Sequence, residues 1–170
     1  MINNRNLADA AFGTHITPLM AAVLATKGNV VEMGMGDYST PLLHEIIKHQ
    51  RCLNSKRKLF SFESDAKWLD NFTDLRNDWH TLESVADWNK LVLPKQISVL
   101  FIDHAPANRR IIDIEKYKDI AQIIVVHDTD KPNYYGYEPT LSEFKSCFVY
   151  ERYRKSTTIV SNFINVSKIL

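Results

Sequence analysis

Apolar residues in this chain gather in short runs that are separated by polar residues and glycines. Four of these runs span residues 30–33, 59–62, 99–102 and 123–126. They are too continuous for strands that face water on one side, because such strands alternate apolar and polar positions. The pattern therefore predicts strands that are buried on both faces, as in the middle of a parallel sheet.

Segments with helical signals lie between these runs. Residues 41–49 carry apolar pairs four positions apart, with Ser39 or Thr40 as the N-cap and Pro41 at the first helical position. Residues 16–24 form an apolar helical segment, and two further crossover helices are expected near 66–72 and 111–117. A strand at 79–82 is expected to be the third of the sheet.

The tail of the chain has a different pattern. Two β-rich runs, 148–154 and 157–163, are separated by Lys155 and Ser156 and predict an antiparallel hairpin. Together with the alternating strands and helices before it, this hairpin predicts one α/β domain over residues 1–170. We expect a doubly wound, mostly parallel seven-stranded sheet with helices on both faces and the antiparallel hairpin at its C-terminal end.

Composition narrows the function classes. The chain of 170 residues is 45% hydrophobic and 24% charged, which is typical of a globular protein, and 21 basic against 20 acidic residues leave a net charge of +1. This balance offers no overall electrostatic footprint for nucleic acid or an anionic membrane. The basic clusters at 56–58 and 152–155 are interpreted as solvated charges. Cys52 and Cys147 lack metal-ligand spacing and are expected to be buried or idle, and with no apolar membrane span we expect a cytoplasmic protein.

Glycine is concentrated in one place. Three of the five glycines are Gly28, Gly34 and Gly36, and the acidic Glu32 stands two positions before Gly34. This stretch forms the turn from the first strand into the first crossover helix, where a helix N-terminus favours polar or anionic groups. A dinucleotide-binding loop would continue to a third glycine, but this chain has Ser39 at that position.

The Glu-x-Gly-x-Gly turn, followed by a second strand that ends in Glu63, resembles the class I S-adenosylmethionine-dependent methyltransferases. The terminal antiparallel hairpin also belongs to that fold. The resemblance implies that the glycine turn lies against the amino-acid part of the cofactor and that Glu63 binds the ribose hydroxyls. It also implies an acid that bonds the adenine amino group, for which Asp87 is the candidate with Trp88 beside the ring. Candidate cofactor-binding residues are therefore Glu32, Gly34, Gly36, Asp37, Ser39, Glu63, Ser64, Asp87 and Trp88.

Candidate catalytic residues follow the fourth and fifth strands. Asp103 and His104 end one strand, and His127 and Asp128 end the other. Chemistry is expected there because ligands bind at the carboxyl ends of parallel strands. Two carboxylates would suit Mg²⁺, which lowers the pKa of a bound hydroxyl, whereas either imidazole could serve instead as a metal-free general base.

This pair of strand ends is similar to the metal-dependent O-methyltransferases of the catechol and macrocin type. The resemblance implies that Asp103 and Asp128 hold the metal. The catechol-type site adds an asparagine or aspartate directly after the fifth-strand acid, where this chain has Thr129, with Asp130 one position further. Near the N-terminus, Thr14 and His15 occupy a position from which related folds reach over the cofactor carboxylate.

The sequence thus predicts an S-adenosylmethionine-dependent methyltransferase that acts on an oxygen, or alternatively a nitrogen, of a small molecule, with Mg²⁺ as a possible second cofactor. The tyrosines at 134, 135 and 137 are expected either to cover the substrate or to pack down on the surface. Two other classes stay open. One is a nicotinamide-dependent oxidoreductase with a modified glycine loop, and the other is a binding protein that keeps the fold without catalysis.

Overall fold

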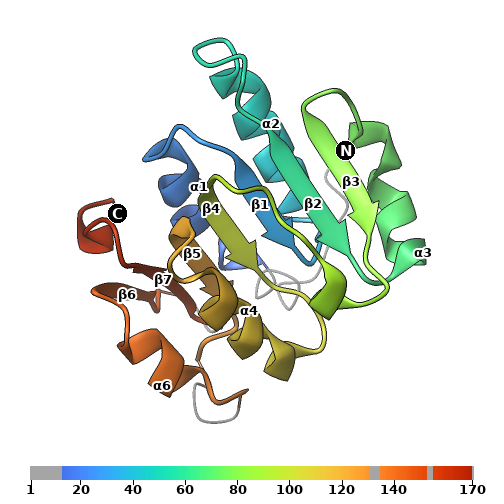
Figure 1. Cartoon of the computed structure of the whole chain (residues 1–170). Helices are drawn as coiled ribbons and strands as arrows, with labels where there is room; N and C mark the ends of the chain where they lie inside the picture. The colour runs from blue at the N-terminus through green and yellow to red at the C-terminus, as the bar shows by residue number, and fades with distance from the viewer. Residues whose placement is uncertain (1–12, 131–134, 153–154, 170) are drawn as a thin grey trace.

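The computed structural model describes residues 13–130, 135–152 and 155–169. These residues build a seven-stranded sheet flanked by helices (Figure 1). The strands are β1 (Val30–Met33), β2 (Leu59–Glu63), β3 (His80–Ser84), β4 (Ile97–Ile102), β5 (Ala121–His127), β6 (Ser146–Tyr150) and β7 (Thr157–Ser161). The α-helices are α1 (Ile16–Leu24), α2 (Thr40–Gln50), α3 (Ala66–Leu69), α4 (Arg110–Tyr117) and α6 (Tyr137–Ser142). Short 3₁₀ turns are η2 (Asp70–Leu75), η3 (Trp88–Lys90), η4 (Ala107–Arg109) and η5 (Val166–Lys168).

The sheet has the strand order β3-β2-β1-β4-β5-β7-β6. Strands β1 to β5 are parallel, and β7 runs antiparallel to both β5 and β6. The predicted doubly wound sheet and its antiparallel hairpin are therefore confirmed. Because the chain first moves outward from β1 to β3 and then crosses to β4, the carboxyl ends of β1 and β4 lie side by side at the switch point, where such folds bind ligands.

Alternating residues of each central strand build two different hydrophobic cores. On β1, Val31 and Met33 face the core under α4 and α6, whereas Val30 faces the core under α1 and α2. Figure 1 shows these two pairs of helices on opposite sides of the sheet. All four side chains of β1 are buried, which confirms the interpretation of the continuous apolar runs. The same alternation places Glu32 on the face covered by α2.

Several local predictions differ from the structure. The expected crossover helix near 66–72 is only the short α3 followed by η2, and the third strand begins at His80 and extends to Ser84. Cys52 and Cys147 are free and exposed, so burial is wrong as one of the two predicted alternatives, buried or idle. Of the tyrosines, residue 134 lies outside the described part of the chain, whereas Tyr137 is fully buried and donates a hydrogen bond to the Ala107 carbonyl over 2.9 Å.

Arg57 also corrects the sequence analysis, because this residue is buried rather than solvated. Its guanidinium donates to the carbonyls of Val23 and Thr26 over 3.1 and 2.8 Å and to the side chain of Gln50. The side chain thereby joins the end of α1 to the end of α2. Burial lowers the pKa of Arg57 to about 10, so it stays charged at neutral pH.

Candidate active site

Gly34 begins the turn after β1 and lies directly against the end of β4. Its φ is +92°, a conformation that residues with a side chain rarely adopt, and its N–H donates to the Phe62 carbonyl over 2.9 Å. A Cβ at this position would lie 2.5 Å from the backbone nitrogen of His104 and 2.6 Å from the carbonyl carbon of Asp103. Position 34 therefore requires glycine because the protein's own backbone, at Asp103 and His104 after β4, packs against it.

Gly36 sits later in the same turn under milder constraints. A Cβ there would meet only the Ser39 Oγ at 3.3 Å. The Gly36 N–H donates to Thr40 Oγ1 over 3.0 Å, and the Thr40 hydroxyl donates in turn to Glu32 Oε1 over 3.1 Å. Glu32 thus shapes the turn through a threonine whose linking role the sequence analysis missed.

Glu32 is fully buried beneath this turn. Burial raises its pKa to about 7, although the hydroxyls of Ser39, Ser61 and Thr40 partly oppose that shift. Within the described residues, no hydrogen bond of normal length reaches Oε2. The carboxyl group therefore keeps its proton to a higher pH than an exposed glutamate does.

This raised pKa predicts a specific pH dependence of stability. Between the ordinary value of 4.5 and about 7, folded Glu32 keeps a proton that the unfolded chain releases, so the free energy of unfolding falls as the pH rises. Urea unfolding at about pH 5 and at about pH 8 gives the change in the free energy of unfolding of each protein. This change should be about 2 to 3 kcal/mol less favourable in the native protein than in Glu32→Gln. The depressed pKa values of His15 and His80 act in both proteins and cancel in this comparison. Equal changes in the two proteins would contradict the prediction.

Glu63, the predicted ribose ligand, lies at the end of β2 and holds two turns together. Its Oε1 accepts from the N–H groups of Ser64 and Asp65 over 2.7 and 2.9 Å, and Oε2 accepts from the N–H of Met35 over 2.9 Å. Oε2 therefore keeps a lone pair for a ligand hydroxyl. Exposed Asp37 and buried Ser39 lie in the glycine turn, and exposed Ser64 lies beside Glu63, so these predicted residues surround one region.

Trp68 on α3 reaches the same turn. Its indole Nε1 donates to the Met35 carbonyl over 2.8 Å, and the side chain stays 38% exposed. Half-exposed tryptophan beside a polar loop offers a flat apolar surface for a ligand. The sequence around Trp68 predicts only a helix, because nothing in the local pattern indicates that α3 folds back over the glycine turn.

Asp87 and Trp88, which are predicted to bind adenine, both have structural roles: Asp87 caps η3 and Trp88 packs in the core. The half-buried Asp87 is the N-cap of η3 and accepts from the Asn89 backbone N–H over 2.9 Å, a bond that lowers its pKa. Trp88 is buried, donates to the Ala105 carbonyl over 3.0 Å and stacks on the His104 ring at a centroid distance of 4.4 Å. Contact with adenine stays a prediction for both residues.

His104 is held inside the protein. Its ring is 1% exposed, and Nε2 lies 2.9 Å from Asp113 Oδ2, which also accepts from Arg109 Nε over 3.2 Å. With Trp88 stacked on one face, the ring has no open approach for a substrate hydroxyl. His127 is just as buried, at 2% exposed, and its two ring nitrogens face Asp103 and Thr14, so the geometry favours neither of the two predicted histidine bases.

Asp103 stands at the centre of the polar groups at the ends of β4 and β5. Oδ1 forms an ion pair with Arg110 Nη2 over 3.0 Å, and Oδ2 lies 3.1 Å from His127 Nδ1. Burial acts to raise the pKa of Asp103, but the hydrogen bond and charge of His127 and the charge of Arg110 outweigh it and lower the pKa. Arg110 also donates to the carbonyls of Asp103, His104 and His127. This arginine, missed in the sequence analysis, fixes both strand ends.

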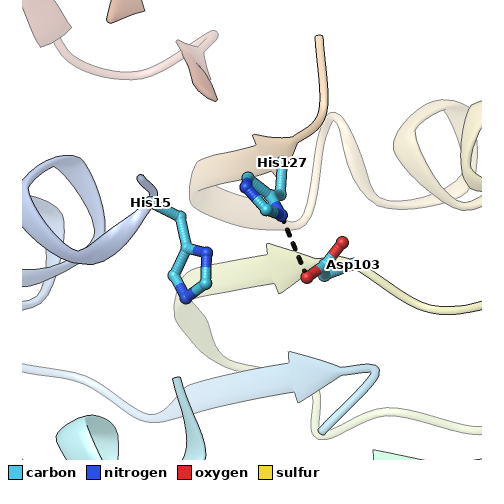
Figure 2. A group of neighbouring side chains, drawn as sticks. All are labelled: His15, Asp103 and His127. Carbon is cyan, nitrogen blue, oxygen red and sulfur yellow. Dashed lines mark hydrogen bonds and ion pairs between the residues drawn. The ribbon is translucent and has the colours of Figure 1, made fainter. Parts of the chain in front are cut away.

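His15, at the start of α1, completes this group (Figure 2). Its ring lies 4.6 Å from the His127 ring, centroid to centroid, and is 3% exposed. Neither ring nitrogen has a hydrogen-bond partner among the described residues. Burial, reinforced by the charge of His127, lowers the pKa of His15 to about 3, so the ring is neutral. Ligand atoms of His15, Asp103 and His127 all lie within 4.8 Å of one another.

Asp128 follows His127 with its backbone in the left-handed region, at φ 59°. Its Oδ1 lies 3.7 Å from His127 Nε2 and 3.5 Å from Lys155 Nζ, and the side chain is 24% exposed. Asp128 is not a member of the three-residue group that could hold a metal. The structure thus brings Asp103 together with two histidines, and the predicted Asp103–Asp128 metal pair stays a prediction.

Comparisons with known proteins identify the fold. No protein family and no curated sequence matches this chain. A TDP-rhamnose 3'-O-methyltransferase of calicheamicin biosynthesis is 11% identical over 91% of this chain and 80% of its own, with a TM-score of 0.59. The chain has the fold of class I S-adenosylmethionine-dependent methyltransferases. A putative class I enzyme from Listeria monocytogenes, 12% identical, covers 95% of this chain and 64% of its own at a TM-score of 0.56.

The methyltransferase fold serves chemically different substrates among these neighbours. A tRNA (m1A58) methyltransferase from Aquifex aeolicus is 11% identical over 86% of this chain and 68% of its own, with a TM-score of 0.58. The fold alone therefore does not select between a small molecule and a nucleic acid. No helix in residues 13–130, 135–152 or 155–169 combines the length and the apolar character that crossing a lipid bilayer requires.

Proposed function

We propose that this protein binds S-adenosylmethionine at the β1–α2 turn and transfers its methyl group to an oxygen atom of a small molecule, with nitrogen as the alternative acceptor. The observation that carries the proposal is a set of hydrogen bonds to one glycine turn. Glu63 and Thr40 accept from its backbone, and Glu32 is bound to it through Thr40. This turn lies at the switch point of a methyltransferase fold. S-adenosylmethionine, when bound, supplies a methyl group on a sulfonium leaving group.

The residues around the turn fit the proposed cofactor. Glu63 has a lone pair free on Oε2 for a ribose hydroxyl, and Trp68 presents a half-exposed ring nearby. A nicotinamide dinucleotide would instead require close approach of a pyrophosphate to three glycines, and this chain has buried Ser39 at the third position. These features support S-adenosylmethionine over NAD.

The proton of the acceptor would leave at the end of β5. Asp128 has a partly exposed carboxylate there, positioned beside His127 and Lys155. A pocket of about 430 Å³ begins at the next residue, Thr129, and is also lined by Asp130, Glu138, Ser156 and Thr158. We assign this pocket to the acceptor because its lining begins one residue after Asp128, the group that would take the proton.

Magnesium does not suit the donor set that the structure assembles. Mg²⁺ prefers oxygen ligands and water, but Asp103 has two imidazoles and a guanidinium around it. The proposed transfer therefore does not involve Mg²⁺. If the protein binds the cofactor without methylating any oxygen or nitrogen acceptor, the non-catalytic binding protein becomes the better description.

Calorimetric titration with S-adenosylmethionine, S-adenosylhomocysteine and NAD tests the proposal. We expect binding of the first two and none of NAD, because the turn lacks the dinucleotide pattern. Glu63→Ala should weaken binding by about 1 to 3 kcal/mol if its carboxylate bonds the ribose. The exposed Glu83→Ala, on the neighbouring strand, serves as the matched control and should leave the affinity unchanged. Binding of NAD alone would refute the assignment, and unchanged affinity in Glu63→Ala would move the cofactor elsewhere.

A further inference from the structure

A neutral His127 ring cannot satisfy all of the hydrogen-bond contacts around it. Thr14 Oγ1 donates its proton to the Lys155 carbonyl over 2.6 Å, because a carbonyl can only accept. The same oxygen lies 3.1 Å from His127 Nε2 and must therefore accept a proton from it. His127 Nδ1 then points its lone pair at Asp103 Oδ2, 3.1 Å away, so two acceptors face one another unless a cation lies between them.

A proton on Nδ1 is one such cation, but His15 points to another. Its ring is buried beside His127 with both nitrogens unpaired among the described residues (Figure 2). An unpaired buried ring nitrogen is costly, since a group of this kind normally has a partner. A proton shared by Asp103 and His127 leaves both nitrogens of His15 unpaired, whereas a metal ion would give one of them a partner.

We propose that His15, Asp103 and His127 form a binding site for a divalent first-row transition-metal ion of the Zn²⁺ or Fe²⁺ kind. Imidazole nitrogen with one carboxylate is the donor set that these metals favour over Mg²⁺ and Ca²⁺. Ligands bound at about 2.1 Å lie about 3.0 to 3.5 Å apart in the first coordination shell, and the Asp103 to His127 distance of 3.1 Å already matches that spacing. The nitrogen of His15 lies within 4.8 Å of both partners and would close in on the ion.

Neighbouring residues hold the proposed metal ligands in place by hydrogen bonds. His127 donates its other ring nitrogen to Thr14, and Arg110 binds Asp103 Oδ1 while Oδ2 stays directed at His127. Metal-binding histidines and carboxylates are commonly oriented by hydrogen bonds of this type. The metal proposal goes beyond cofactor binding, because it needs neither S-adenosylmethionine nor turnover.

Titration with Co²⁺ alone tests the site, since Co²⁺ replaces Zn²⁺ and reports its ligands by visible absorption. The experiment is run on the native protein and on Cys52→Ser/Cys147→Ser, because the two exposed thiols could bind the ion elsewhere. We expect one ion per chain in both proteins, displaced by Zn²⁺ and not by excess Mg²⁺. His15→Ala should bind roughly a hundredfold more weakly, whereas His49→Ala, an exposed histidine, should bind like the native protein.

A second measurement covers the case in which His15→Ala folds poorly. Zn²⁺ should raise the thermal midpoint of the native protein and of His49→Ala, because an ion that binds only the folded state stabilises it, and should leave that of Asp103→Asn unchanged. Absence of stoichiometric binding, or binding and stabilisation that persist without His15 and Asp103, would overturn the metal site. Because cofactor is omitted, this failure is distinct from a failure to bind S-adenosylmethionine.

Discussion

Replacing Gly34 by alanine should lower the free energy of unfolding by about 3 to 5 kcal/mol. Two costs combine in this estimate. The backbone φ of +92° strains any residue with a side chain, and the added Cβ would lie 2.5 Å from the His104 nitrogen. The His104 nitrogen and the Asp103 carbonyl carbon cannot move aside cheaply, because both are backbone atoms directly after the central strand β4. Urea unfolding of the purified variant measures the loss.

Gly36→Ala provides the matched control two positions later. Its Cβ would meet only a serine hydroxyl at 3.3 Å, so we expect a loss of about 1 kcal/mol or less. Similar losses in the two variants would show that the turn requires general flexibility rather than one close approach. The comparison thus separates the role of Gly34 in packing from any role in ligand binding.

Replacing Arg110 by methionine should destabilise the protein by about 3 to 5 kcal/mol. The side chain is 7% exposed and joins the Asp103 carboxylate to three backbone carbonyls at the ends of β4 and β5. Methionine keeps much of the length but leaves a carboxylate and three carbonyls without their donor. The loss is measured by urea unfolding at neutral pH.

The exposed Lys116 on the same helix gives the control. Lys116→Met removes a charge that bonds one carbonyl at the surface, and we expect a change within about 0.5 kcal/mol. An Arg110→Met protein as stable as Lys116→Met would mean that the two strand ends hold their geometry without the guanidinium. In that event Asp103 and His127 would need another explanation for their alignment.

Part of the candidate site follows from local sequence. A polar residue directly after a buried parallel strand must lie at the carboxyl edge of the sheet, so Glu63, Asp103 and Asp128 could be assigned to one edge before any contact was known. The glycines after β1 likewise indicated a tight approach. What approaches Gly34 could not be predicted, because the atoms concerned belong to Asp103 and His104, which follow β4 almost seventy residues later along the chain.

The different surroundings of the two predicted histidine bases, His104 and His127, also arise from long-range packing. His104 and His127 have similar neighbours in sequence, an aspartate and the end of an apolar strand. Only the packing of α4 and η3 places Asp113 and Trp88 on His104, while the turn before α1 places Thr14 and His15 beside His127. Ring environment depends on these long-range contacts, which no local pattern encodes.

The sequence by itself determined the order of strands and helices, the parallel sheet with its antiparallel end, and the edge at which polar groups gather. These properties depend on periodicity, capping and the continuity of apolar runs, all of which are local along the chain. The tertiary structure decided which of those polar groups are buried, paired or open: it placed Arg110 on Asp103, Thr40 on Glu32 and His15 beside His127. Charge states and ligand geometry follow from burial and from distances of a few ångströms, and these arise only when distant segments pack together.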